Sequence, residues 1–215
     1  CGSFGAPARD WLKGLSKNGI GVWQFLPLAP TDSTGSPYSS PSSFAYNPWF
    51  LDANDLVSEG FLPPSLHLQL PYTFEERSEV IDFCLANERS ERLGDFLFEA
   101  WPYQSEQRHL EFSLWCKDQF WLEDHACFIE LRSQFKNLPW WEWPKGMSIY
   151  NNNELEIWRR NNHQKMMRHR LIQWHLDRQW QLLRKLSKEL GVLLFGDMPF
   201  YVSRDSADVW SSREL

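Results

Sequence analysis

The sequence has few basic residues and no long hydrophobic run. Its 215 residues carry 22 Lys and Arg against 28 Asp and Glu, which gives a formal net charge of −6. Nucleic-acid-binding domains present a basic patch or stripe, so we expect no nucleic-acid partner. The longest apolar stretches, such as residues 192–195, are far shorter than the roughly 20 residues that span a bilayer. No signal peptide is visible, and we therefore expect no membrane partner.

Cysteine is also scarce. The four cysteines form no C-x-x-C pair and no zinc-binding spacing, and a chain of this size is too poor in cysteine for a disulfide scaffold. We expect reduced, buried thiols and a location in the cytoplasm. The six histidines indicate no metal set, and no P-loop, G-x-G-x-x-G or G-x-S-x-G motif is present. The common nucleotide-binding and serine-hydrolase motifs are therefore missing.

Tryptophan, by contrast, is abundant, with 13 residues in the chain. Large aromatic side chains fill cores and also form flat platforms for ring-shaped ligands. Packing in the core is sufficient to account for most of them. The length of 215 residues allows one domain with a substantial core, but it is short for a (β/α)8 barrel, which typically needs about 250 residues.

The two ends of the chain repeat one order of elements. Residues 8–17 have a helical apolar pattern, a glycine follows, and residues 20–26 are a mostly apolar run of strand length. Residues 164–190 carry an apolar helical face, and another glycine precedes the apolar run 192–195. Such continuous runs predict strands that are buried on both faces. Helix, glycine, buried strand and polar loop, found twice, indicate a parallel α/β sheet or barrel.

The stretch between these two units is far longer than an ordinary crossover, and residues 56–162 look mainly helical. The pattern predicts a helix over 74–88, opened by a capping box of Thr73 and Glu76. A long, aromatic-rich helix is predicted over 114–135. A helical subdomain inserted after one strand is the simplest organisation.

Side chains suited to a ligand site follow both predicted strands. The loop 31–40 contains Ser36 and Tyr38 among several hydroxyl groups, and the carboxyl ends of parallel barrel strands form the ligand face. Hydroxyls donate and accept hydrogen bonds, and Tyr38 offers a flat face for stacking on a sugar ring. Asp197 directly follows the second strand and would line the same site. The alternatives are an ordinary surface loop and a structural turn.

A third polar segment, residues 203–210, lies close behind Asp197. It is a further candidate for the site. The alternative is that Asp205 or Ser206 caps a short helix there.

Several segments together resemble glycoside hydrolase family 77, the 4-α-glucanotransferases that include amylomaltase and the plastid disproportionating enzyme. They are WQFLPLAPT at 23–31, SPYSS at 36–40, SFA at 43–45, NP at 47–48, WLEDHA at 121–126, PWWEWP at 139–144, QW at 173–174, RQW at 178–180, GDMPFYV at 196–202 and DSADVW at 205–210. The resemblance covers nearly the whole chain but somewhat under half of a typical family member.

The fold class that this resemblance implies is α/β, an incomplete TIM-type (β/α)8 barrel with a large, mainly α-helical insertion. The predicted strands would be the second and third of the barrel. Residues 1–52 would be a barrel part with a helix, a strand and the donor-sugar loop. Residues 53–162 would be the helical insertion subdomain, and residues 163–215 a second barrel part with a helix, a strand and a loop.

The activity implied by the resemblance is transfer of α-1,4-glucan segments to glucose or to another α-1,4-glucan. Its partner would be a maltooligosaccharide, starch or glycogen, and no metal or organic cofactor is expected. Tyr38 would stack on the donor glucose at the cleavage point, Ser36 would hydrogen-bond a neighbouring glucose, and Asp197 would line the pocket. A retaining double displacement needs two carboxyl groups about 5 Å apart.

The family carries its nucleophile and its acid/base on later strands, so no catalytic residue is expected in this segment. Both ends of the sequence look cut, and we expect the 215-residue chain alone to transfer no glucan. One departure is the stretch 32–35, which replaces a more usual G-x-G-D-like sequence and leaves the shape of the loop open. The alternatives are a non-catalytic glucan-binding paralogue and an α/β domain of another glycosidase family.

Overall fold

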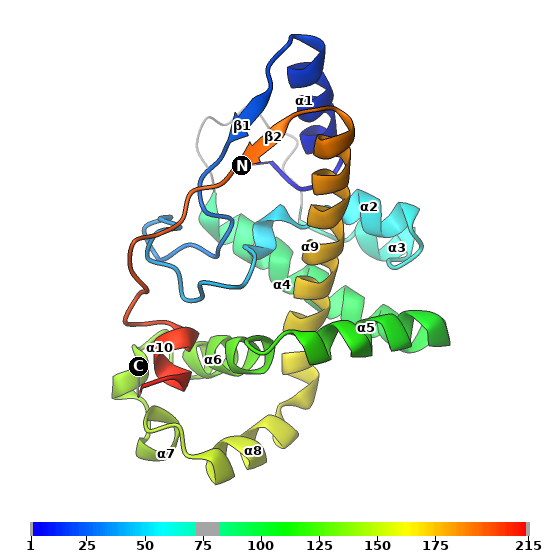
Figure 1. Ribbon diagram of the computed structural model, residues 1–215. Coiled ribbons are helices and arrows are strands. Elements are labelled where there is room, and N and C mark those ends of the chain that lie inside the picture. The colour runs from blue at the N-terminus through cyan, green and yellow to red at the C-terminus, as the bar shows by residue number, and fades with distance from the viewer. Residues whose placement is uncertain (1, 72–81, 214–215) are drawn as a thin grey trace.

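The computed structural model describes residues 2–71 and 82–213. Its longest helix, α9 (His163–Glu189), runs through the middle of the molecule and contacts helices from the amino-terminal and middle parts of the chain (Figure 1). Apolar side chains recur along α9 at helical spacing, and those that face the core, such as Leu176, are buried. The helix ends before Gly191, whose φ of 69° suits a residue without a side chain. The predicted carboxy-terminal helix is therefore confirmed.

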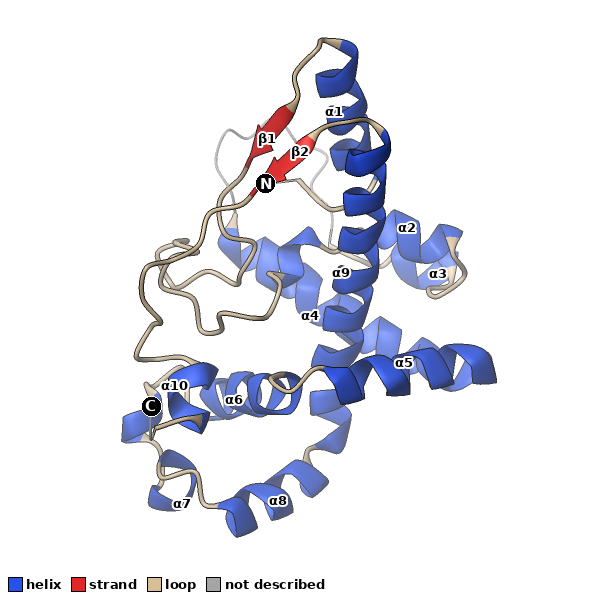
Figure 2. Cartoon of the chain, viewed as in Figure 1, coloured by secondary structure: helices blue, strands red, loops and turns tan. Residues whose placement is uncertain are grey.

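The helix α1 (Ala6–Lys17) and the strands β1 (Val22–Gln24) and β2 (Leu193–Phe195) lie together at one end of α9 (Figure 2). The two strands pair in parallel, and Trp23 lies opposite Leu194. Parallel neighbours require a crossover connection, and here the helical part of the chain provides it. The parallel pairing that the repeated order predicts is confirmed for these strands.

The prediction that both strands are buried on both faces is wrong. Trp23 and Leu194 pack against the core, whereas Val22, Leu193 and Phe195 are 51%, 69% and 58% exposed. Successive residues of a strand point to opposite faces. Among the described residues, helices cover only the face that carries Trp23 and Leu194, so an apolar run in the sequence is not proof of burial on both sides.

The section between the strands is helical, as predicted. Its α-helices are α2 (Ala53–Ser58), α3 (Pro64–His67), α4 (Phe83–Ala100), α5 (Glu106–Asp118), α6 (Leu122–Gln134), α7 (Lys145–Ser148) and α8 (Asn152–Asn161), and α10 (Ala207–Ser211) follows β2. Short 3-10 helices occur at η1 (Pro48–Phe50), η2 (Trp101–Tyr103) and η3 (Trp140–Glu142).

Two details of this section differ from the sequence pattern. The long helix predicted over 114–135 is divided between α5 and α6, because Gln119 leaves the helical region with φ −99° and ψ 85°. The apolar spacing continues across this break, which explains why periodicity alone joins the two helices. The capping box of Thr73 and Glu76 lies outside the described residues. Within them, the helix in this region begins at Phe83, with the Asp82 side chain accepting from the Leu85 N–H at 3.0 Å.

Buried apolar side chains form two clusters. The larger cluster joins α9 to α1, α2 and α4 and contains Trp174. The smaller cluster joins α6, α8 and α10 and contains Trp143, Trp158 and Trp210. Large aromatic residues thus make up much of both cores, as the abundance of tryptophan predicts.

Two buried glutamines of α9 bind the backbone of the segment that follows the first polar loop. The Gln173 side chain accepts from the Tyr46 N–H at 2.9 Å and donates to the Tyr46 carbonyl at 2.8 Å. Gln179 does the same with the N–H and the carbonyl of Asp52, at 2.9 Å each. Each amide satisfies one backbone donor and one acceptor, so the segment is tied to α9 at two points.

We predict that Gln179→Leu lowers the free energy of unfolding by about 2–4 kcal/mol, because it leaves a buried backbone donor and acceptor without partners. Gln181→Leu on the same helix is the matched control, since Gln181 is exposed, and it should change stability by no more than about 0.5 kcal/mol. Urea unfolding of both variants measures the difference. Equal midpoints would show that the amide of Gln179 does not secure the segment.

Cys127 is buried, and its burial raises the pKa of its thiol to about 12. It therefore fits the expectation of an unreactive buried thiol, and Cys116 is free as well. Cys84 is exposed, contrary to that expectation, because it lies in the first turn of α4 with its side chain turned outward. Across the described parts of the chain, none of the helices has the length and apolar character needed to cross a membrane.

Candidate functional site

The candidate site lies where the loops after β1 and β2 meet. The Tyr38 hydroxyl donates a hydrogen bond to Oδ2 of Asp197 at 2.6 Å, although 159 residues separate them. The parallel pairing of β1 and β2 explains this contact, since it places the carboxyl ends of both strands at the same edge. The structure thus brings together two of the three residues that the sequence indicates for sugar binding. Their role in binding stays a prediction.

The hydrogen bond affects the ionisation of the Tyr38 phenol. The bond to the Asp197 carboxylate, together with the negative charge of Asp197, raises the pKa of Tyr38 above its ordinary value. Tyr38 therefore stays protonated at neutral pH and acts as the donor. Asp197 is exposed and Tyr38 partly exposed, so a ligand can reach both side chains.

Ser36, the third predicted residue, lies beside Tyr38 in the same loop. Its Oγ accepts a hydrogen bond from the Tyr38 N–H at 3.3 Å. The Ser36 hydroxyl thereby helps to hold the backbone conformation between Ser36 and Tyr38. Its proton remains available for a ligand, because a hydroxyl donates one hydrogen bond and accepts up to two.

The loops after the two strands are joined at a second point as well. The Ala207 N–H donates to the Pro41 carbonyl at 2.9 Å, and the Ser43 N–H donates to Oδ2 of Asp208 at 2.8 Å. Burial raises the pKa of Asp208, although its bond with Ser43 works in the opposite direction. Sequence reasoning includes Asp208 in the candidate segment 203–210 but gives it no role of its own. Its position two residues after Ser206 is the signal that the sequence offers.

That polar segment serves mainly to anchor the second loop. Ser206 caps α10 by accepting from the Val209 N–H at 3.2 Å, as one of the two predictions for it states. Asp205 instead accepts from the Trp140 N–H at 3.3 Å and forms an ion pair with Arg132 at 3.1 Å. These contacts attach the loop after β2 to the helical part of the chain.

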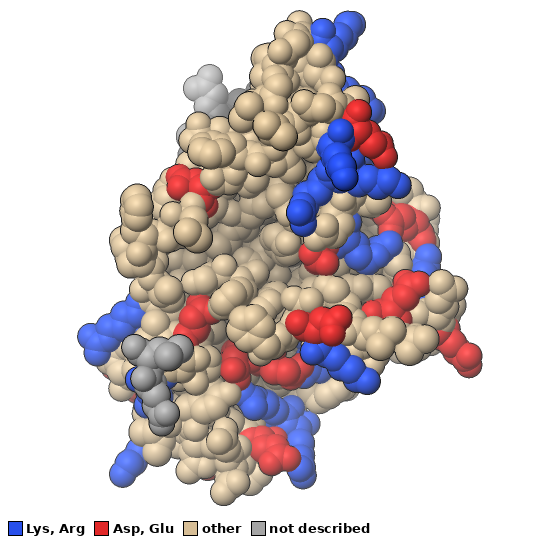
Figure 3. Space-filling view, in the orientation of Figure 1, with Lys and Arg blue, Asp and Glu red and all other residues tan. Residues whose placement is uncertain are grey.

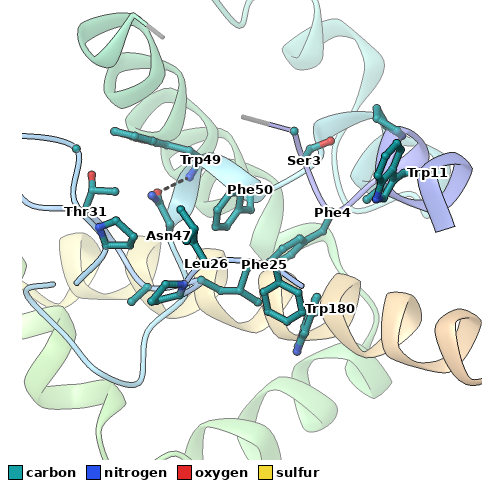
Figure 4. Close-up of a pocket in the computed structure, with 18 of the residues that line it drawn as sticks. Ser3, Phe4, Trp11, Phe25, Leu26, Thr31, Asn47, Trp49, Phe50 and Trp180 are labelled. Atoms are coloured by element: carbon teal, nitrogen blue, oxygen red, sulfur yellow. Dashed lines mark hydrogen bonds between the residues drawn. The ribbon is translucent and has the colours of Figure 1, made fainter. Parts of the chain in front are cut away.

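An apolar cavity of about 630 Å³ adjoins the first loop. Figure 4 shows Phe4, Phe25 and Trp180 gathered on one side of it, and the Phe25 and Trp180 ring centroids are 5.5 Å apart. Gly35 and Pro37 also line the cavity, so its wall is shared with the loop that carries Tyr38. Among the residues that the structure describes, its lining includes no charged side chain. This lining suits an apolar group.

The face that Figure 3 displays carries Lys, Arg, Asp and Glu in small, mixed groups. A hollow between the strand end of the molecule and the helices below is bordered mainly by uncharged side chains. Within the described residues, no group of three or more His, Cys, Asp or Glu is placed to hold a metal ion. These features suit a neutral, polar ligand better than an ionic one.

The chemical capacity of the site follows from its groups. Tyr38 and Asp197 supply an aromatic ring, a hydroxyl donor and one carboxylate within a single contact. A sugar can be oriented by ring stacking together with hydrogen bonds to its hydroxyls. Glycosyl transfer with retention needs a pair of carboxyl groups, of which this contact provides at most one. The arrangement can therefore orient a sugar, but this contact does not supply the carboxyl pair that retention needs.

Comparison with known sequences covers the whole chain. A sequence profile of the 4-alpha-glucanotransferases matches residues 1–215. A 4-alpha-glucanotransferase from Synechocystis sp. is 33% identical over 215 residues, which cover 99% of this chain and 42% of the relative. One from Thermus thermophilus is also 33% identical, with 99% and 42% covered. The chain thus spans 42% of the length of these relatives.

Solved structures give the same result. The amylomaltase from Streptococcus agalactiae in complex with acarbose matches with a TM-score of 0.91 at 28% identity, covering 99% of this chain and 43% of that one. The amylomaltase from Corynebacterium glutamicum matches with a TM-score of 0.58 at 16% identity, covering 96% and 29%. The second likeness concerns the fold alone.

Proposed function

This chain belongs to the 4-alpha-glucanotransferase family, and we propose that it forms the donor-binding part of an enzyme that transfers α-1,4-glucan segments. The observation that carries this proposal is the contact between Tyr38 and Asp197 at the shared edge of two parallel strands. A ring, a hydroxyl and a carboxylate at one accessible point are the groups that a sugar needs. The family supplies the type of sugar, an α-1,4-glucan.

The roles of the three residues follow from their groups. A glucose ring of the donor lies against the Tyr38 ring, while Asp197 accepts hydrogen bonds from its hydroxyls. The Ser36 hydroxyl donates a hydrogen bond to a neighbouring glucose while its oxygen accepts from the Tyr38 N–H. Holding the donor in one orientation is how such residues raise the rate, because it converts a bimolecular encounter into an ordered reaction.

We further propose that the two strands are the second and third strands of a (β/α)8 barrel. The parallel pairing of β1 and β2 supports this, as does the crossover through a long helical section. In this organisation residues 1–52 and 163–215 belong to the barrel, and residues 53–162 are the inserted subdomain. The ligand then binds at the carboxyl ends of the strands, as in other barrels of this type.

The chemistry would be a retaining double displacement, in which a carboxylate forms a glycosyl-enzyme and a second sugar receives the glycosyl group. The two reacting carboxyl groups would come from the part of its relatives' length that this chain does not match. The acceptor is glucose or another α-1,4-glucan. The proposed substrates of the enzyme are maltooligosaccharides, starch and glycogen, and its proposed location is the cytoplasm.

The test is disproportionation of maltotriose. The natural protein that carries this sequence should release glucose and form longer maltooligosaccharides, whereas the 215-residue chain by itself should bind the sugar without transferring it. Chromatography of the products over time measures both. Binding without transfer by the natural protein would favour a non-catalytic glucan-binding paralogue. The absence of both binding and transfer would contradict the proposed function.

A further inference from the structure

The loop that carries Tyr38 is built around the side chain of Asp32. Its Oδ1 accepts three hydrogen bonds, from the Thr34 N–H at 2.8 Å, the Thr34 hydroxyl at 2.6 Å and the Ser36 N–H at 3.0 Å. One carboxylate oxygen thus satisfies two backbone donors and a hydroxyl within five residues. A turn of this kind is fixed by its side chain as well as by its backbone.

The backbone of the same turn is closed by two further bonds. The Asp32 N–H donates to the Ser36 carbonyl at 3.0 Å, and the Gly35 N–H donates to the Asp32 carbonyl at 3.1 Å. Gly35 has a φ of 85°, and the place that a Cβ would take is filled by the Phe83 ring, 2.6 Å away. The turn therefore has one well-defined shape, and Phe83 supports it from behind.

We propose that Asp32 is a positioning residue, whose carboxylate holds the turn 32–36 in the shape that lets Tyr38 reach Asp197. Three hydrogen bonds, linked through the covalent structure of Ser36 and Tyr38, carry this effect. Asp32 binds the Ser36 N–H, Ser36 Oγ accepts from the Tyr38 N–H, and the Tyr38 hydroxyl donates to Asp197. The consequence for glucan binding rests on the proposed function, whereas the contact between Tyr38 and Asp197 does not.

The charge state of Asp32 is consistent with this role. Burial raises the pKa of Asp32, but the hydrogen bonds from Thr34 and Ser36, together with the nearby Gly35 N–H, outweigh it and hold the pKa below its ordinary value. Asp32 is therefore ionised at neutral pH. Its hydrogen bonds are made to a charged acceptor, which strengthens them.

The experiment reads the environment of Tyr38 directly. Tyrosine labelled with 13C at Cζ reports the pKa of each phenol by NMR, and the chain contains six tyrosines, few enough to assign with Tyr38→Phe. In the 215-residue chain the pKa of Tyr38 should lie above its ordinary value. Asp32→Ala should lower it to about 10, the value of an unperturbed tyrosine, because Tyr38 then loses its contact with Asp197.

Matched variants distinguish the effect of the Asp32 charge from the effect of its hydrogen bonds on the position of Tyr38. Asp32→Asn removes the same charge as Asp32→Ala but keeps Oδ1 as an acceptor, so it should leave the pKa of Tyr38 raised. Thr34→Val removes one donor from an exposed residue, a change that poses little threat to folding, and should lower the pKa in part. Asp197→Ala, which removes both the acceptor and the charge, should lower it fully. Asp10→Ala, which removes an exposed acid from α1, should have no effect.

Titration with maltoheptaose adds the functional readout. Asp32→Ala should raise the dissociation constant about tenfold, roughly the contribution of one hydrogen bond, while Asp32→Asn should change it by less than about threefold. A raised Tyr38 pKa that persists in both Asp32→Ala and Thr34→Val would overturn the proposal. If the pKa values behave as expected and no form of the chain binds maltoheptaose, Asp32 still positions Tyr38, and it is the proposed glucan function that fails.

Discussion

Replacing Tyr38 with alanine is expected to lower kcat/KM for glucan transfer by about 100-fold, the scale on which misplacement of a bound substrate reduces the rate. The substitution removes the ring on which the donor glucose is proposed to stack and also the hydroxyl that binds Asp197. Initial rates of glucose release from maltotriose, measured on the natural protein that carries this sequence, give the value.

Two variants show which part of Tyr38 matters. Tyr38→Phe keeps the ring and loses only the hydrogen bond to Asp197, so it should reduce kcat/KM by about tenfold or less. Tyr103→Ala is the control for a general loss of aromatic surface, because Tyr103 is 88% exposed and belongs to no proposed site. An unchanged kcat/KM in Tyr38→Ala would remove Tyr38 from the site.

Replacing Trp210 with alanine is expected to lower the free energy of unfolding by about 3–5 kcal/mol, the usual cost of removing a large buried aromatic side chain. Trp210 is fully buried, and its ring lies 4.8 Å from Tyr150 and 5.8 Å from both Phe128 and Trp143, measured between centroids. Its indole N–H also donates to the Met147 carbonyl at 2.9 Å.

This substitution should also affect the candidate site, because Trp210 anchors α10 and α10 holds the loop after β2. Urea unfolding followed by tryptophan fluorescence measures the stability. Trp11→Ala is the matched control, since Trp11 is 54% exposed, and it should cost less than about 1 kcal/mol. Equal losses in the two variants would show that the aromatic cluster around Trp210 contributes no special stability.

The sequence predicts the parts of this fold that have a periodic or positional signal. Helical spacing identifies α1 and α9, and the glycines after them mark where the helices end. The repeated order of helix and strand predicts parallel pairing, and parallel pairing places Tyr38 and Asp197 at one edge. The contact between these residues is therefore a consequence that sequence reasoning can reach.

Other features have no such signal. Gln173 and Gln179 bind backbone groups of a distant segment, and nothing in the local pattern distinguishes them from exposed glutamines. The strands are apolar on both faces, yet one face of each is exposed among the described residues, because burial depends on what packs against a strand. The three hydrogen bonds to Asp32 depend on the shape of a turn that composition alone does not define.

The most direct test of the account is a titration of the 15N-labelled 215-residue chain with maltoheptaose, followed by amide chemical shifts. We expect the largest shift changes at Ser36, Tyr38 and Asp197, and their loss in Tyr38→Ala. Shift changes that occur only around the apolar cavity beside Trp49 and Phe50, or that persist unaltered in Tyr38→Ala, would contradict it.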